Sequence, residues 1–221
     1  MTDRTQPVAH PDGSPSDKSA AADEPRSLDP ATTAVVVVDV QRLFTDMAGA
    51  PIEPPLSDVL PRIRTFLGDS RRAGVTTVLV RTIIASDSHS QSTRQWPEFM
   101  RAGTAPGAPG TEFDPCLDAQ PGDLEIVKPR YSAFFGTRLD EILRGRGIDT
   151  VVVLGLTTNV CVQSTARDAW QRDYRTITLD DCCAEIGEGS HAASLAWTSR
   201  NFGMVCTSSE VCRRWRLAVR S

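Results

Sequence analysis

The chain has 221 residues, with 24 basic and 28 acidic side chains, a formal net charge of −4 and a mean hydropathy of −0.24. This length fits one domain that buries its own hydrophobic core. The mild acidity argues against a nucleic-acid-binding surface, which needs a clustered basic excess, and no apolar run is long enough to span a membrane.

The first 30 residues differ in composition from the rest of the chain. They contain five prolines, six acidic residues and no aromatic residue. Such a segment cannot bury enough apolar surface to offset its ordering entropy, so we expect a disordered tail over 1–30 and a folded domain over 31–221. Because this tail lacks the apolar stretch of a secretory signal, we expect a cytoplasmic protein whose six cysteines are free thiols.

Apolar patterning in the first half predicts two strands and a helix. A β-branched run, Thr33–Val40, is typical of a strand buried on both faces, and Val75–Ile84 predicts a second strand. Between them, apolar residues recur at helical spacing over Leu56–Leu67, where Pro61 leaves the start of the helix open. The polar, Gly- and Pro-rich stretch 85–122 predicts a functional loop or lid.

The second half alternates strands and helices. Strands are predicted at Leu124–Val127, Thr150–Leu154, Thr176–Leu179 and Met204–Cys206. Helices are predicted from a cap at Thr137 to Gly145, from about Val160 to Asp173, over Ser190–Asn201 and at the C-terminus. This order predicts the α/β class: a doubly wound, mostly parallel sheet of about six strands with helices on both faces. Such sheets bind ligands beyond the carboxyl ends of their strands.

Three reactive side chains follow three of the predicted strands: Asp39, Lys128 and Cys161. We expect them to meet, because the carboxyl ends of parallel strands share one edge. Asp39 can accept the thiol proton and return it to a leaving nitrogen, a cation beside Cys161 favours the thiolate, and backbone amides at 157–161 would face an oxyanion. A buried structural cysteine, a strand-end aspartate and a surface lysine also fit. However, 22 of the 24 basic residues are arginines, and an arginine fork cannot replace a compact ammonium in a tight site.

Two sequence blocks carry a family resemblance: VVVVDVQRLF, and VKPRYSAFFGTRLDEILRGRGIDTVVVLGLTTNVCVQSTARDA. Over about residues 31–212 the chain resembles the isochorismatase-like cysteine hydrolases, which share a Rossmann-like three-layer sandwich. The second block looks most like ureidoacrylate and biuret amidohydrolases, followed by N-carbamoylsarcosine amidase. The resemblance places a catalytic triad on Asp39, Lys128 and Cys161. It also implies an oxyanion hole of backbone amides at Thr157 and Cys161, a non-proline cis peptide before Thr157, and a homodimer or homotetramer.

The resemblance implies a cysteine-dependent amidohydrolase without a cofactor. It would cleave a C–N bond of a small linear amide, ureido or carbamoyl compound through a thioester, and release ammonia or an amine. Two alternatives remain: an amidase of the same family acting on a maleamate, nicotinamide-like or antibiotic-derived amide, and a non-catalytic binding protein on the same scaffold. We expect a small-molecule amide as the partner, and neither nucleic acid nor membrane.

Further polar and aromatic residues near the strand ends are candidates for substrate binding, although each also fits a packing, capping or ion-pairing role: Phe44, Trp96, Arg130, Tyr131 and Asn159. The Asp87-Ser-His89 sequence resembles the beginning of a metal site. The other histidines lie far from it in the sequence, so we expect no metal. The cysteines other than Cys161 in the second half are expected to pack in the core or at sheet ends: Cys182, Cys183, Cys206 and Cys212.

Overall fold

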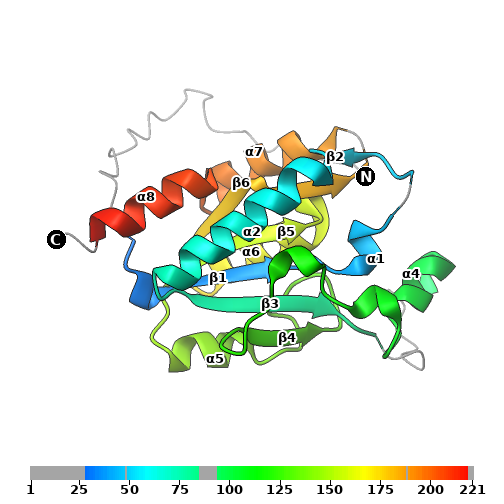
Figure 1. The fold of residues 1–221 in the computed structure, drawn as a ribbon, viewed down its shortest axis with the longest axis horizontal. Coiled ribbons are helices and arrows are strands. Elements are labelled where there is room, and N and C mark those ends of the chain that lie inside the picture. Colours follow the sequence, from blue (N-terminus) through cyan, green and yellow to red (C-terminus); the bar gives the residue numbers. More distant parts are fainter. Residues whose placement is uncertain (1–27, 48, 85–93, 188, 219–221) are drawn as a thin grey trace, which may run out of the picture.

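The computed structural model describes residues 28–47, 49–84, 94–187 and 189–218. At its centre lies a seven-stranded sheet in the order β2-β6-β5-β1-β3-β4, with β7 also paired to β6 (Figure 1). Every pair is parallel except β2 with β6, which is antiparallel. The strands are β1 Thr33–Val38, β2 Ile52–Glu53, β3 Thr76–Thr82, β4 Leu124–Lys128, β5 Thr150–Leu156, β6 Arg175–Ile186 and β7 Met204–Cys206.

Helices cover both faces of the sheet, which confirms the predicted fold class. On one face α2 and α8 pack together, with the rings of Phe66 and Trp215 stacked 5.4 Å apart, and on the other lie α6 and α7 (Figure 1). The helices are α1 Arg42–Thr45, α2 Leu56–Arg72, α4 Glu98–Gly103, α5 Leu139–Gly145, α6 Gln163–Gln171, α7 Ser190–Asn201 and α8 Ser208–Ala218. Short turns are η1 Pro30–Thr32, η2 Pro109–Thr111, η3 Pro115–Leu117 and the π-turn η4 Thr158–Val162.

The central strand β1 approaches β5 very closely near the carboxyl edge. All six residues of β1 are buried, as its β-branched composition predicts. Gly155 of β5 pairs with Val38 and has a φ of +119°, and a Cβ atom there would lie 2.1 Å from the Val38 carbonyl oxygen. Only glycine fits this contact, which keeps the ends of β1 and β5 side by side.

Several element boundaries differ from the sequence predictions. β6 continues to Ile186, seven residues beyond the predicted end, because its second half pairs with β2 and with the end of β5. The hydroxyl of Thr137 accepts a hydrogen bond from the Leu139 amide at 3.2 Å, but helix α5 begins at Leu139. The short elements β2, α1 and α4 were not predicted, since two to six residues carry too little periodicity.

The folded part begins earlier than predicted. Leu28 is 1% exposed within the core, and the Asp29 carboxylate accepts a hydrogen bond from the amide of Ala31, so residues 28–30 belong to the domain rather than to a tail. The remainder of the predicted tail lies outside the described residues. Among the residues that are described, no helix has the length and apolar character needed to cross a bilayer.

Candidate active site

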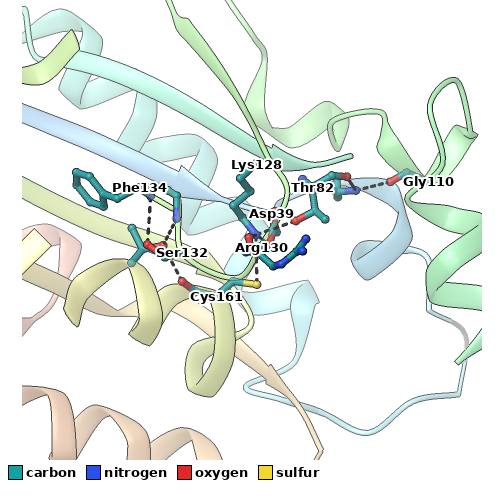
Figure 2. A network of polar contacts seen from close by, with 11 residues as sticks. Asp39, Thr82, Gly110, Lys128, Arg130, Ser132, Phe134 and Cys161 are labelled. Carbon is teal, nitrogen blue, oxygen red and sulfur yellow. Dashed lines mark hydrogen bonds and ion pairs between the residues drawn. The ribbon is translucent and has the colours of Figure 1, made fainter. Parts of the chain in front are cut away.

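Three strand ends bring an acid, an amine and a thiol into one buried corner. Asp39 directly follows β1 with a φ of +52°, a left-handed conformation that aspartate tolerates. Lys128 ends β4, and Cys161 lies in η4, directly after β5. The Lys128 Nζ atom lies 2.7 Å from Asp39 Oδ2 and 3.5 Å from Cys161 Sγ, and the side chains of Asp39 and Lys128 are 0% exposed (Figure 2). The structure therefore brings the three predicted residues together.

Thr82, the last residue of β3, links the acid to the amine. Its hydroxyl accepts a hydrogen bond from Lys128 Nζ at 2.7 Å and donates one to Asp39 Oδ1 at 3.0 Å. The Arg130 carbonyl accepts another from Lys128 Nζ at 3.0 Å. Sequence analysis missed Thr82 because threonine is an ordinary strand residue, but its place at a strand end beside β1 and β4 was a usable signal.

Burial and the neighbouring charges shift the pKa values of both Lys128 and Cys161. Burial alone would lower the pKa of Lys128, but the Asp39 carboxylate and the Cys161 sulfur raise it above its ordinary value. Burial and the nearby Asp39 carboxylate raise the pKa of the Cys161 thiol, against the opposing effect of Lys128. The Asp39 carboxylate and the Lys128 ammonium therefore act on the pKa of this thiol in opposite directions.

A cavity of about 270 Å³ opens above Cys161. Three of the five residues predicted to bind substrate line it, namely Phe44, Trp96 and Tyr131. Trp96 and Tyr131 stack with ring centroids 6.0 Å apart, and the Trp96 indole N–H donates to the Tyr131 hydroxyl oxygen at 3.2 Å. The predicted lid segment thus reaches the site through Trp96 and α4.

The other two predicted binding residues, Arg130 and Asn159, do not line the cavity. The Arg130 guanidinium donates to the carbonyl of Pro129 at 2.6 Å, so Arg130 contributes to the site through its own carbonyl. The Asn159 side chain accepts a hydrogen bond from the Ser194 hydroxyl of α7 at 2.9 Å. Both side chains make local backbone or helix contacts, and their role in substrate binding stays a prediction.

The turn from Thr157 to Cys161 forms one wall of the cavity. The peptide bond between Leu156 and Thr157 is cis, and the Val162 amide donates to the Thr157 carbonyl at 3.1 Å as part of the π-turn. Thr157 and Cys161 are 8% and 7% exposed, and both line the cavity. Their backbone amides are thus close to the point where a bound carbonyl would meet the thiol.

Sequence analysis also missed Glu185, which lines the same cavity and is 4% exposed. Its carboxylate accepts hydrogen bonds from the amides of Asn159 and Ile186. Burial raises the pKa of Glu185 above its ordinary value, although these two amides and the Thr157 side chain act in the opposite direction. Glu185 was overlooked because the predicted strand ended at Leu179, which placed this residue in a loop.

The remaining predicted features concern metal and cysteine chemistry. Within the described ranges, no group of three or more His, Cys, Asp or Glu side chains is arranged to hold a metal ion. Asp87 and His89 lie outside those ranges. His191 is buried, with its Nδ1 atom 2.9 Å from the Thr158 hydroxyl. The cysteines expected to pack in the core are buried free thiols, as predicted: Cys182, Cys183, Cys206 and Cys212.

Known proteins match the chain over most of its length. The family model described as the isochorismatase domain matches residues 33–210. Ureidoacrylate amidohydrolase RutB from Methylobacterium radiotolerans is 35% identical over 207 residues, covering 84% of this chain and 80% of that protein. A cysteine hydrolase from Pseudomonas syringae pv. phaseolicola has a TM-score of 0.79 at 32% identity, covering 87% of this chain and 96% of that one. N-carbamoylsarcosine amidase from Thermoplasma acidophilum has a TM-score of 0.67 at 30% identity, covering 80% and 95% of the two chains. The chain therefore belongs to the isochorismatase family.

Proposed function

We propose that the protein is a cysteine-dependent amidohydrolase acting on a small linear amide, ureido or carbamoyl compound. The observation that carries this proposal is the ammonium of Lys128, 2.7 Å from the Asp39 carboxylate and 3.5 Å from the Cys161 sulfur, which itself lines an open cavity. Relatives named as amidohydrolases at 33–35% identity and an N-carbamoylsarcosine amidase among the structural neighbours support it.

In the first half of the reaction Asp39 removes the thiol proton of Cys161 as the sulfur attacks the carbonyl carbon. Negative charge moves to the carbonyl oxygen, and the amides of Thr157 and Cys161 donate hydrogen bonds to it. Lys128 remains an ammonium throughout and balances the charge that passes between the carboxylate and the sulfur. The C–N bond then breaks, the nitrogen takes the proton from Asp39, and ammonia or an amine leaves a thioester on Cys161.

In the second half a water molecule enters where the amine has left. Asp39, again a carboxylate, takes one proton from this water as its oxygen attacks the thioester carbonyl. The C–S bond breaks, and the sulfur recovers a proton from Asp39. One amide and one water are thus converted into one acid and one amine, and the thiol, the carboxylate and the ammonium return to their starting states.

Ammonia release by the full chain tests this mechanism. The panel contains ureidoacrylate, biuret, N-carbamoylsarcosine, maleamate and nicotinamide, and a mass shift on Cys161 after acid quenching reports the thioester. Cys161→Ala should abolish release, whereas the control Cys206→Ala, at another buried free thiol, should retain it. Ammonia release at the wild-type rate from Cys161→Ala would disprove the mechanism.

A non-catalytic binding protein on this scaffold is the competing function. Calorimetry and ammonia release on the same panel separate the two, because a catalytic protein turns over an amide that it binds. Binding of an amide by the wild type without any release of ammonia would favour a binding protein. We also propose a cytoplasmic homodimer or homotetramer, which light scattering tests; Phe135, Trp170 and Trp197 are each more than half exposed and could be covered in it.

A further inference from the structure

The buried groups beside the cavity balance in charge without Glu185. The Asp39 carboxylate and the Lys128 ammonium form a buried ion pair, so with the thiol proton on Cys161 the three groups carry no net charge. Moving the thiol proton to Asp39 does not change this sum. The charge that the cavity presents to a ligand is therefore set by the residues on its walls.

Glu185 is the charged residue on those walls. Among the described residues that line the cavity there is no arginine, lysine or histidine, and none of the described arginines and lysines forms an ion pair with Glu185. Burial raises the pKa of Glu185 above its ordinary value, but the Asn159 and Ile186 amides donate hydrogen bonds to its carboxylate and so favour the ionised form. A carboxylate has about four acceptor positions, so these two donors leave room for donors from a ligand.

Several other residues that line the cavity are aromatic. Phe44, Phe99 and the stacked pair Trp96 and Tyr131 all line the cavity with Glu185. The face of an aromatic ring attracts a cation, and a buried carboxylate beside such faces strengthens that attraction. A ligand carboxylate in the same place would lose its hydration, and the neighbouring Glu185 carboxylate would repel it where a cation would be needed to stabilise it.

We infer that Glu185 and the aromatic walls select an amide whose far end is an ammonium, a guanidinium or a similar N–H-rich cation, and that they reject one ending in a carboxylate. This inference rests on the proposed function only for the amide end of the ligand, where the C–N bond would be cleaved. It separates this protein from relatives named for ureidoacrylate, because ureidoacrylate carries a carboxylate. Glu185 is on this view the residue that determines specificity.

Three amides of equal chain length test the inference: γ-aminobutyramide, pentanamide and glutaramate, whose far ends are cationic, neutral and anionic. Their dissociation constants are measured by calorimetry on the full-length Cys161→Ser variant, where no turnover occurs. The cation should bind tightest and the anion weakest. Glu185→Gln in the same background should lower the cation-to-anion preference about ten- to a hundredfold, the size expected for one nearby charge in a partly screened site.

Glu141→Gln is the matched control, because Glu141 lies on α5 with its side chain 71% exposed and does not line the cavity. It should leave the preference unchanged. A merely structural effect of Glu185→Gln would weaken all three ligands in proportion and leave their ratio intact. Absence of binding by the cation, tighter binding by the anion, or an unchanged ratio in Glu185→Gln would each overturn the inference.

A second measurement needs no Glu185 variant. Cationic trimethylammonium and anionic sulfonate forms of an ethyl methanethiosulfonate reagent should modify Cys161 of the wild type at different rates, the cation faster, with Cys161→Ser as the blank. A faster sulfonate would contradict the charge preference. Ammonia release from any amide by the wild type tests the proposed function separately, so failure of the chemistry and failure of the specificity can be told apart.

Discussion

The two ends of strand β4 each carry an ion pair, and the two pairs are built differently. At the amino end, Arg71 binds Asp123 through two nitrogens, with Nε to Oδ1 at 3.2 Å and Nη2 to Oδ2 at 2.7 Å. Those side chains are 20% and 6% exposed. At the carboxyl end, Lys128 and Asp39 are both fully buried, and the ammonium also contacts Thr82, the Arg130 carbonyl and the Cys161 sulfur.

The difference shows how one strand can carry a structural pair and a chemical pair. The Arg71 guanidinium donates two hydrogen bonds to one carboxylate, and this bidentate pairing fixes the geometry of the pair at a partly exposed site. An ammonium is a compact point charge whose three protons reach several acceptors, so it can hold an acid and a thiol within reach of one another. The comparison implies that exchanging the two cations should damage activity at one end of β4 and only stability at the other.

The largest effect is expected for Lys128→Arg. The longer planar guanidinium cannot occupy a fully buried ammonium site without displacing Asp39 or Cys161, and overpacking of this kind costs roughly 1–3 kcal/mol of stability. A displacement of about 1 Å at reacting groups lowers rates about 10²-fold, so we expect ammonia release to fall by about that factor or more. Circular dichroism should show a folded protein. Activity within about twofold of the wild type would mean that the ammonium has no chemical role.

Thr82→Val should have the next largest effect, because it removes the hydroxyl that joins Lys128 to Asp39 and leaves both partners short of a buried hydrogen bond. We expect a loss of about 1–3 kcal/mol in the free energy of unfolding and a measurable fall in kcat. Thr77→Val is the matched control on the same strand. The Thr77 hydroxyl is buried without a hydrogen-bond partner among the described residues, so its loss should be neutral or stabilising. Equal effects of the two variants would show that the Thr82 link is unimportant.

A smaller effect is expected in the pH dependence of Cys161 alkylation without substrate. Burial and Asp39 raise the pKa of this thiol above its ordinary value of 9.0, so its thiolate fraction is small at neutral pH and increases as pH rises. The iodoacetamide rate at Cys161 should therefore climb about tenfold per pH unit from about pH 6 to about pH 9. Mass spectrometry of the Cys161 peptide measures this rate. A plateau near neutral pH would indicate a preformed thiolate and contradict the proposed role of Asp39 as base.

The carboxyl edge of the sheet could be predicted from sequence much better than the cavity walls. Asp39, Lys128 and Cys161 each follow a continuous β-branched or apolar run, and strand topology brings such ends together whatever the side-chain packing. Glu185 lies at the end of a strand whose second half is stabilised by pairing with the two-residue β2, a contact between residues more than 130 positions apart. No local sequence pattern indicates such a long-range contact. Arg130 and Asn159 make local hydrogen bonds to a carbonyl and to α7 that no sequence pattern indicates, and their role in binding stays a prediction.

The smallest effect is expected for Arg71→Lys, the reciprocal exchange at the amino end of β4. Lysine keeps the charge but loses the second hydrogen bond to Asp123 and the contact from Nη2 to the Leu117 carbonyl at 3.1 Å. Asp123 still accepts a hydrogen bond from the Gln120 amide at 2.9 Å, so its carboxylate keeps a backbone donor. We expect a loss of about 0.5–1.5 kcal/mol in urea unfolding and unchanged ammonia release. A fall in activity similar to that of Lys128→Arg would show that β4 transmits any disturbance to its carboxyl end. Unchanged activity would show that activity depends on the four contacts of the Lys128 ammonium and is insensitive to a disturbance at the other end of β4.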